Sequence, residues 1–160
     1  MMSNYYIDTC ALKWRYLNGS PTPDVNQLMD NPNASVTTSE LTILEWSSAL
    51  ASTYRDGTID YDLFKRNELA LMSDIAVGKL LIFPMTRTIE RARYLIEFVG
   101  IHHGRALKTG DSIQVTTALD ASAAVHQLTT FVTCDESLSN IIRDVGEFRP
   151  HLDSLYLPPS

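Results

Sequence analysis

The sequence has few of the features that mark specialised classes of protein. It contains only two cysteines, Cys10 and Cys134, too few for a disulfide-rich secreted scaffold and without the spacing of a zinc site. No window approaches the roughly 18 continuous apolar residues of a membrane span, and the first residues lack the pattern of a signal peptide. We therefore expect a soluble cytoplasmic protein without a membrane partner, in which both cysteines are free, small and buried.

Positive charge is also in short supply. The chain has 13 Lys and Arg against 19 Asp and Glu, a formal net charge of −6, which counts against a protein that coats nucleic acid non-specifically. A net charge does not say where the charges lie, so a local basic patch could still contact nucleic acid. A glycine-rich phosphate loop of the Walker type is absent as well. With 160 residues, 44% of them apolar, the chain is predicted to form a single domain over residues 1–160.

Short apolar strands alternate with amphipathic helices along the chain. We predict strands near residues 5–7, 35–37, 79–83, 128–133 and 152–157, and helices near 38–54, 60–77, 88–102, 110–124 and 136–145. Residues 21–33, with three prolines and three asparagines, are predicted to form a loop. The alternation is typical of the α/β class, here a three-layer α/β/α sandwich with a mainly parallel central sheet.

Four acidic residues are expected at one end of this sheet. Functional residues in such sheets gather outside the carboxyl ends of the strands. Asp8 and Asp135 follow predicted strands, Asp111 opens a predicted helix, and Glu45 lies about two turns into another. Each aspartate also stands where a helix N-cap is expected, so capping alone would explain each one taken singly.

Glu45 is harder to explain as an ordinary surface residue. It is flanked by Leu44 and Trp46, and the nearest basic residue in the sequence that follows it is Arg55. A carboxylate among apolar neighbours needs a partner or a cation to offset its lost hydration. A group of carboxylates without a His or Cys set suits Mg²⁺ or Mn²⁺. With such an ion bound, the group could activate a water for attack on a phosphodiester.

Four short motifs in this order resemble the PIN domain, and more narrowly the VapC-type toxin ribonucleases of toxin-antitoxin pairs. They are residues 6–9, 38–46, 110–119 and 131–138, and the resemblance extends over about residues 5–145. It implies that Asp8, Glu45, Asp111 and Asp135 form the catalytic, metal-binding constellation. It further implies supporting roles for Thr9, Ser39 and Thr133 beside these acids.

The resemblance also implies Mg²⁺- or Mn²⁺-dependent cleavage of RNA, a small antitoxin as partner, and a homodimer. Ser112 and Gln114 depart from the pattern, since the family commonly has Ala or an apolar or aromatic residue beside the third acid and a His soon after it. The departure leaves the carboxylates intact but bears on which substrate is chosen.

A basic stretch precedes the third acid. Its positive residues outnumber its acids, which predicts either a solvated helix face or a flank that contacts RNA phosphates. The candidate RNA-contact residues are Arg87, Arg91, Arg93, Arg105 and Lys108. Another open question concerns Trp46, Tyr54, Tyr61 and Phe64, which are either core residues or the lining of a groove for a partner's helix.

Three hypotheses for function follow from the sequence. The leading one is a metal-dependent endoribonuclease that acts as the toxin of a type II toxin-antitoxin pair. The second keeps the nuclease activity but assigns it to housekeeping RNA maturation without an antitoxin. The third is a non-catalytic binding module with a PIN-like fold.

Overall fold

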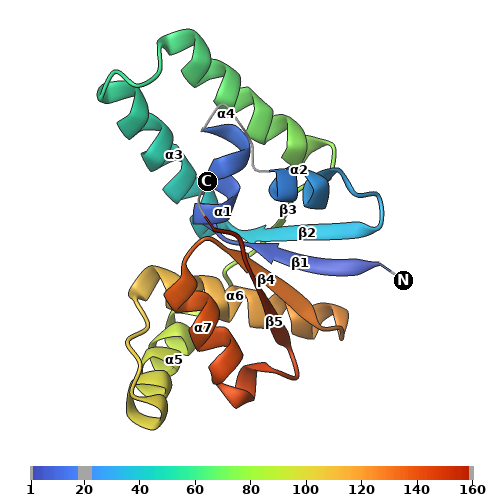
Figure 1. The fold of residues 1–160 in the computed structure, drawn as a ribbon, viewed down its shortest axis with the longest axis vertical. Coiled ribbons are helices and arrows are strands. Elements are labelled where there is room, and N and C mark those ends of the chain that lie inside the picture. Colours follow the sequence, from blue (N-terminus) through green and yellow to red (C-terminus); the bar gives the residue numbers. More distant parts are fainter. Residues whose placement is uncertain (1, 18–22, 159–160) are drawn as a thin grey trace.

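A single sheet organises the molecule. The structure is a computed structural model that describes residues 2–17 and 23–158. Within these ranges five strands form one sheet in the order β3-β2-β1-β4-β5, and every neighbouring pair is parallel (Figure 1). The strands are β1 (Ser3–Ile7), β2 (Ala34–Ser39), β3 (Leu81–Phe83), β4 (Thr129–Thr133) and β5 (Leu152–Tyr156). Each predicted strand is present.

Helices cover both faces of this sheet (Figure 1). One face carries α1 (Thr9–Tyr16), α2 (Pro23–Asp30), α3 (Glu40–Arg55) and α4 (Tyr61–Ala76). The other carries α5 (Thr88–His103), α6 (Thr109–Val125), α7 (Glu136–Asp144) and the short 3₁₀ helix η1 (Gly146–Phe148). The prediction of a three-layer α/β/α sandwich is confirmed, and the sheet is parallel throughout its described strands.

The two central strands divide the core into two layers. Successive side chains of a strand point to opposite faces. In β1, Tyr6 packs with the α5–α7 layer and Ile7 with the α1–α4 layer, and in β4 Phe131 and Val132 divide in the same way. All four side chains are at most 1% exposed, so both faces of the sheet centre are closed to water.

The prediction of a loop over residues 21–33 is wrong, because residues 23–30 form α2. Pro23 takes the first helical position, where a missing N–H costs nothing, and Asp24 lies in the first turn, where a negative charge is favoured. Val25 and Met29, one turn apart, are buried in the core. Pro23 and Asp24, which favour the start of a helix, were thus mistaken for residues of a loop. Residues 21 and 22 lie outside the described ranges.

The aromatic residues of α3 and α4 differ in how deeply they are buried. Trp46 is buried and contacts Tyr16 edge to face, as a core residue should. Tyr54 and Tyr61 are 46% and 56% exposed and meet Phe64 at the end of the α3–α4 hairpin, which extends beyond the sheet (Figure 1). The core interpretation therefore holds for Trp46 and fails for these two tyrosines.

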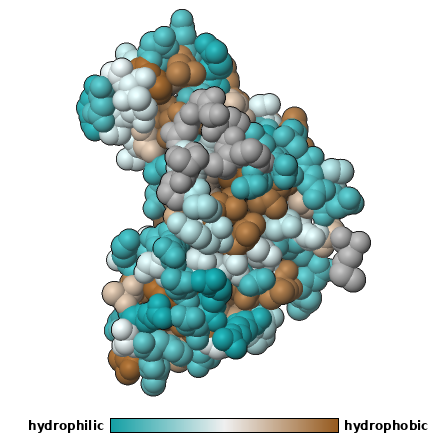
Figure 2. Space-filling model, in the orientation of Figure 1, coloured by the Kyte–Doolittle hydropathy of each residue, from teal (hydrophilic) through white to brown (hydrophobic). Residues whose placement is uncertain are grey.

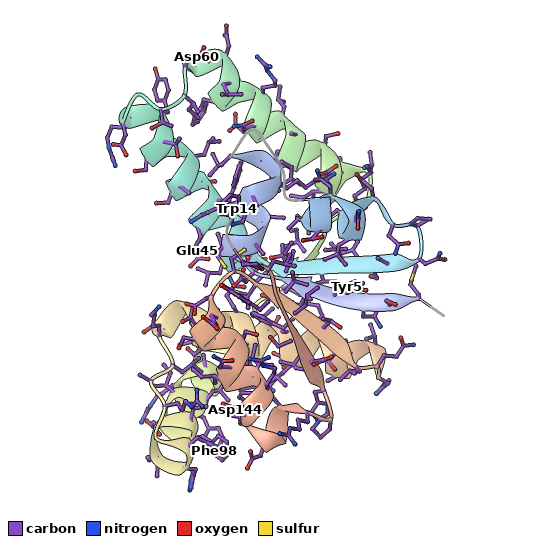
Figure 3. All side chains as sticks on the ribbon, viewed as in Figure 1. Tyr5, Trp14, Glu45, Asp60, Phe98 and Asp144 are labelled. Carbon is purple, nitrogen blue, oxygen red and sulfur yellow. The ribbon has the colours of Figure 1, made fainter. Side chains whose placement is uncertain are left out.

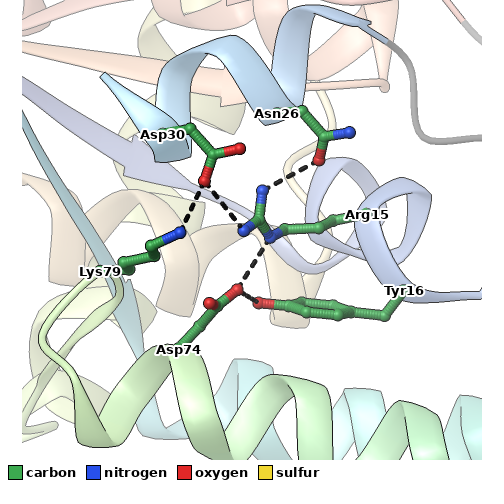
Figure 4. Close-up of polar contacts among 6 residues, drawn as sticks. All are labelled: Arg15, Tyr16, Asn26, Asp30, Asp74 and Lys79. Atoms are coloured by element: carbon green, nitrogen blue, oxygen red, sulfur yellow. Dashed lines mark hydrogen bonds and ion pairs between the residues drawn. The ribbon is translucent and has the colours of Figure 1, made fainter. Parts of the chain in front are cut away.

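A polar network ties the base of α4 to α1 and α2 (Figure 4). Arg15 Nε donates to Asp74 Oδ2 at 2.8 Å, and Tyr16 O–H donates to the same oxygen at 2.7 Å. The guanidinium also reaches Asn26 Oδ1 at 2.9 Å and Asp30 Oδ1 at 3.3 Å. The side chains of Arg15 and Asp74 are only 12% and 14% exposed, so water screens this pair weakly.

Replacement of Asp74 by Asn is expected to lower the free energy of unfolding by about 2 kcal/mol, because it leaves a largely buried guanidinium without its main anion. Urea unfolding measures the change. The matched control is Glu68→Gln, which breaks the exposed pair with Lys65 and should cost less than about 0.5 kcal/mol. Equal losses in the two variants would show that the network does not stabilise the hairpin base.

Among the described residues, no helix is both long enough and apolar enough to cross a membrane.

Candidate active site

The parallel register places the first and last acids side by side. Ile7 of β1 is paired with Val132 of β4, so the residues that follow these two strands meet at one edge of the sheet. Thr133 Oγ1 donates to Asp8 Oδ2 at 2.6 Å and accepts from the backbone N–H of Asp135 at 3.0 Å. Thr133 therefore links the two acids directly.

Asp8 is a buried carboxylate that also begins α1. Its Oδ1 accepts hydrogen bonds from the backbone N–H of Ala11 and from Cys10 Sγ, both at 3.0 Å. Asp8 is only 5% exposed. Burial raises the pKa of Asp8 well above its usual value, and the Cys10 contact adds to the shift. The N-cap role is thus real, but it leaves a charge in a place where water cannot hydrate it.

Asp111 does not cap its helix. It is the third residue of α6, whose N-cap is Lys108, and Lys108 makes no capping bond with its side chain. Burial raises the pKa of Asp111, Lys108 opposes the rise, and the charges of Asp135 and Glu45 add to it. The prediction that Asp111 stands at a cap position is wrong, and its proximity to two other carboxylates is the feature that remains.

Glu45 is held by polar partners and not by apolar neighbours. Its Oε2 accepts from the Thr9 hydroxyl and from Gln114 Nε2, the latter at 3.1 Å. Leu44 is 67% exposed and Trp46 is 2% exposed, because successive residues of α3 point about 100° apart. The expected apolar surroundings of Glu45 are therefore absent, while the expected partners are present.

One cavity of about 430 Å³ brings these acids together. It lies between α3, the start of α1 and the start of α6. Figure 3 labels Glu45, one of the residues that line it. Figure 2, in the same orientation, shows that the surface narrows there, below the α3–α4 hairpin. All four predicted acids line it, together with Thr9, Cys10, Lys13, Ser48, Ala49, Ser52, Gly110 and Gln114. A larger cavity of about 560 Å³, between α5, α6 and η1, contains none of the four acids and is lined largely by apolar side chains.

The donor set of the smaller cavity fits a hard divalent cation in its chemistry. Its acids offer carboxylate oxygens, the ligands that Mg²⁺ and Mn²⁺ favour. Burial raises the pKa of Asp111, and the charges of Asp135 and Glu45 add to that rise. Among the described residues, no three His, Cys, Asp or Glu side chains are already close enough together to hold one ion. The carboxylates would therefore have to draw together around a cation.

The predicted supporting residues occupy different positions. Thr9 donates to Glu45, and Thr133 donates to Asp8. Ser39 contacts none of the four acids: its hydroxyl caps α3 by accepting from Thr42 N at 3.2 Å and donates to Gln114 Oε1 at 3.0 Å.

Most of the predicted RNA-contact residues lie away from the cavity and are engaged elsewhere. Arg91 pairs with Asp120, Arg93 with Glu97 at 3.1 Å, and Arg105 with Asp144. Exposed Arg87 is the N-cap residue of α5 and does not line the cavity. Of the predicted set, Lys108 alone reaches the acids, with Nζ 3.5 Å from Asp135 Oδ2.

Lys13 is a cavity residue that the sequence reasoning missed. It lies one turn after Thr9 on α1, so the two side chains share a face of that helix. That spacing is the signal that could have identified it. Lys13 lines the cavity from α1, and Lys108, the N-cap residue of α6, lies beside one of the cavity acids, Asp135.

The two cysteines lie next to each other beside the site, free as expected but only partly buried. The backbone N–H of Cys134 donates to Cys10 Sγ at 3.0 Å, and both residues are free and partly buried. The contact with the Cys134 side chain and burial raise the pKa of Cys10, so its thiol keeps the proton that it donates to Asp8.

No model of a known protein family and no curated protein matches the sequence. Several solved structures match the fold. A chain of VapBC2 from Rickettsia felis, bound to a DNA fragment from its promoter, is 14% identical with a TM-score of 0.57, covering 94% of this chain and 98% of that chain. A chain of FitAcB from Neisseria gonorrhoeae is 16% identical with a TM-score of 0.60, covering 93% and 96%.

A chain of VapBC-5 from Mycobacterium tuberculosis, a member of the VapBC family of toxin-antitoxin systems, is 12% identical with a TM-score of 0.59, covering 97% and 99%. The protein has a PIN-like fold. The likeness extends over nearly the whole length of both chains, so the PIN-like fold accounts for the described sheet and for the helices on both of its faces. The predicted fold resemblance is thereby confirmed, and the acid-lined cavity lies at the strand ends where this fold gathers residues from separate segments.

Proposed function

We propose that the protein is a Mg²⁺- or Mn²⁺-dependent endoribonuclease and the toxin of a toxin-antitoxin pair. The observation that carries the proposal is the single cavity lined by Asp8, Glu45, Asp111 and Asp135. The acids come from four separate stretches of the chain, and burial raises the pKa of two of them, Asp8 and Asp111, so the charged forms of these two cost folding free energy. A fold that only needed stability would gain by replacing such carboxylates.

The four acids would hold the cation, with Asp8 and Asp111 as its main ligands. A bound divalent ion supplies the charge that activates a water and stabilises the phosphodiester as it is cleaved. Thr133 and Thr9 keep Asp8 and Glu45 in place through their hydroxyls. Lys13 and Lys108 flank the acids and would contact phosphates on either side of the cleaved bond, which gives affinity without base specificity.

The toxin assignment is supported by the solved structures that share the fold. VapBC-5 is a member of a family of toxin-antitoxin systems, and the VapBC2 and FitAB structures are bound to DNA fragments. By analogy we propose a small antitoxin as the partner of this chain, and a homodimer as its assembly. The alternative of a housekeeping nuclease uses the same cavity and differs only in lacking an antitoxin.

Expression in bacterial cells tests the proposal. The wild-type chain is expected to arrest growth and to leave new cleavage ends in cellular RNA, because an unrestrained ribonuclease destroys its substrates. Co-expression of the gene beside it should restore growth. Harmless expression of a chain that cleaves RNA in vitro would instead assign it to RNA maturation.

A further inference from the structure

Gln114 is a buried side chain of the cavity wall to which the proposed function assigns no role. It lies on α6 three residues after Asp111, so both side chains project from the same face of that helix. The residue is only 4% exposed. A buried amide has two donors and an acceptor to satisfy, so its partners decide what it does.

The orientation of the Gln114 amide is fixed from one side. Its Oε1 accepts from Tyr6 O–H at 2.5 Å and from Ser39 O–H at 3.0 Å. Because the carbonyl oxygen faces these donors, the NH₂ group must point the other way.

The NH₂ group points at Glu45. Gln114 Nε2 donates to Glu45 Oε2, Thr9 Oγ1 and Thr42 Oγ1, each at 3.1 Å, and the Thr9 hydroxyl donates to the same carboxylate oxygen of Glu45. The other oxygen, Oε1, lies 3.4 Å from where a Cβ on Gly110 would stand. One oxygen of Glu45 is therefore tied down by two donors, and the other faces the first turn of α6, which carries Asp111.

We propose that Gln114 is a positioning residue that orients the carboxylate of Glu45 so that Oε1 is presented to the divalent cation beside Asp111. The inference rests on the proposed function, because it concerns the same metal-dependent site. A free glutamate side chain loses rotamer entropy when it is ordered. The pair of donors on Oε2 orders Glu45 before the cation arrives.

The test uses two variants of Gln114 with different structural costs. Gln114→Met keeps the length of the side chain and removes every hydrogen bond. Gln114→Glu keeps the acceptor for Tyr6 and Ser39 and replaces the NH₂ donor to Glu45, Thr9 and Thr42 with a carboxyl oxygen, so it remains informative if the first variant folds poorly. Gln27→Met, at an exposed glutamine of α2, is the matched control and should behave as the wild type.

Both variants are expected to lower kcat for Mn²⁺-dependent RNA cleavage by about 10- to 100-fold, the usual effect of losing a residue that orients a metal ligand. KM for RNA should change less than about twofold, because Gln114 lies behind Glu45. The affinity for Mn²⁺ alone, measured by calorimetry, should fall by about tenfold. Unchanged kcat and unchanged Mn²⁺ affinity in both variants would overturn the proposal.

A double-mutant cycle with Glu45→Gln separates positioning from mere structural support. If Gln114 acts through Glu45, its replacement causes no further loss of kcat or Mn²⁺ affinity once Glu45→Gln is present. Equal losses in both backgrounds would overturn the proposal and leave Gln114 a packing residue. If the wild type binds Mn²⁺ but cleaves no RNA, the proposed function fails and the affinity cycle alone decides the role of Gln114. A wild type that binds no Mn²⁺ overturns both.

Discussion

Replacement of Asp111 by Asn is expected to reduce metal-dependent RNA cleavage by about a thousandfold, or about 4 kcal/mol of transition-state stabilisation. The charges of Asp135 and Glu45 act on Asp111, and the change removes its carboxylate while keeping the size of the side chain. The loss should appear in kcat and in the affinity for Mn²⁺. Cleavage of a labelled RNA under saturating Mn²⁺ measures the first, and calorimetry measures the second.

The matched control for this variant is Asp62→Asn, at an exposed aspartate in the first turn of α4. It removes the same charge from the chain, so any effect of net charge on RNA binding appears in both variants. Only Asp111→Asn should lose cleavage. Retention of more than about a tenth of wild-type kcat by Asp111→Asn would remove this residue from the site.

Replacement of Asp8 by Asn is expected to make the metal-free chain more stable at neutral pH while it abolishes Mn²⁺-dependent cleavage. Burial raises the pKa of Asp8 in the folded chain, so between about pH 4 and the raised value the folded chain holds a proton that the unfolded chain releases. Stability therefore falls as the pH rises through that window. Asn carries no charge to desolvate and still caps α1.

Thermal unfolding in EDTA measures the difference. At pH 7.5 the Asp8→Asn variant should unfold a few degrees above the wild type, since about 1 kcal/mol shifts the midpoint of a domain this size by roughly 2–4 °C. The gap should close as the pH approaches about 4. Addition of Mn²⁺ at about a hundred times its Kd should stabilise the wild type by about 2.7 kcal/mol and the variant far less. A variant less stable than the wild type in EDTA at pH 7.5 would show that the Asp8 charge serves structure.

Much of the fold could be predicted because it depends on periodic patterns. The alternation of strands and helices predicted the five described strands, and the caps predicted at Asp8 and Asp135 begin helices in the structure. The wrong predictions concern residue types that occur in two kinds of structural setting. Pro23 both breaks helices and begins them, and Tyr54 and Tyr61 have the periodicity of a core helix on a hairpin that extends beyond the core.

The site could be predicted only as far as strand ends and motifs specify it. Three of the acids were predicted from their positions after strands or at the start of a helix, and Glu45 from its position about two turns into another helix. The structure brings all four to one cavity. The partners of the basic residues could not be predicted in the same way. The sequence does not show that Arg91 pairs with Asp120 while Lys108 pairs with Asp135. Those choices depend on how α5 packs on α6, which is a tertiary property.

Gln114 illustrates the remaining gap. In the sequence it was a departure from a family pattern, and in the structure it connects β1, β2 and α3 through Tyr6, Ser39 and Glu45. Its partners are separated from it by 108, 75 and 69 positions. No local pattern encodes contacts of that range, so only the folded chain reveals them.

The most direct measurement is the cleavage of a single-stranded RNA by the purified wild-type chain, followed with Mn²⁺ or Mg²⁺, with EDTA, and after the ion is restored to the chelated sample. The account predicts internal cleavage with either ion, none with EDTA, and recovery when the ion returns, because the carboxylate cavity needs a divalent cation. Cleavage that continues in EDTA, or a folded chain that neither binds Mn²⁺ nor cleaves RNA, would contradict it, and the second outcome would make the protein a binding module.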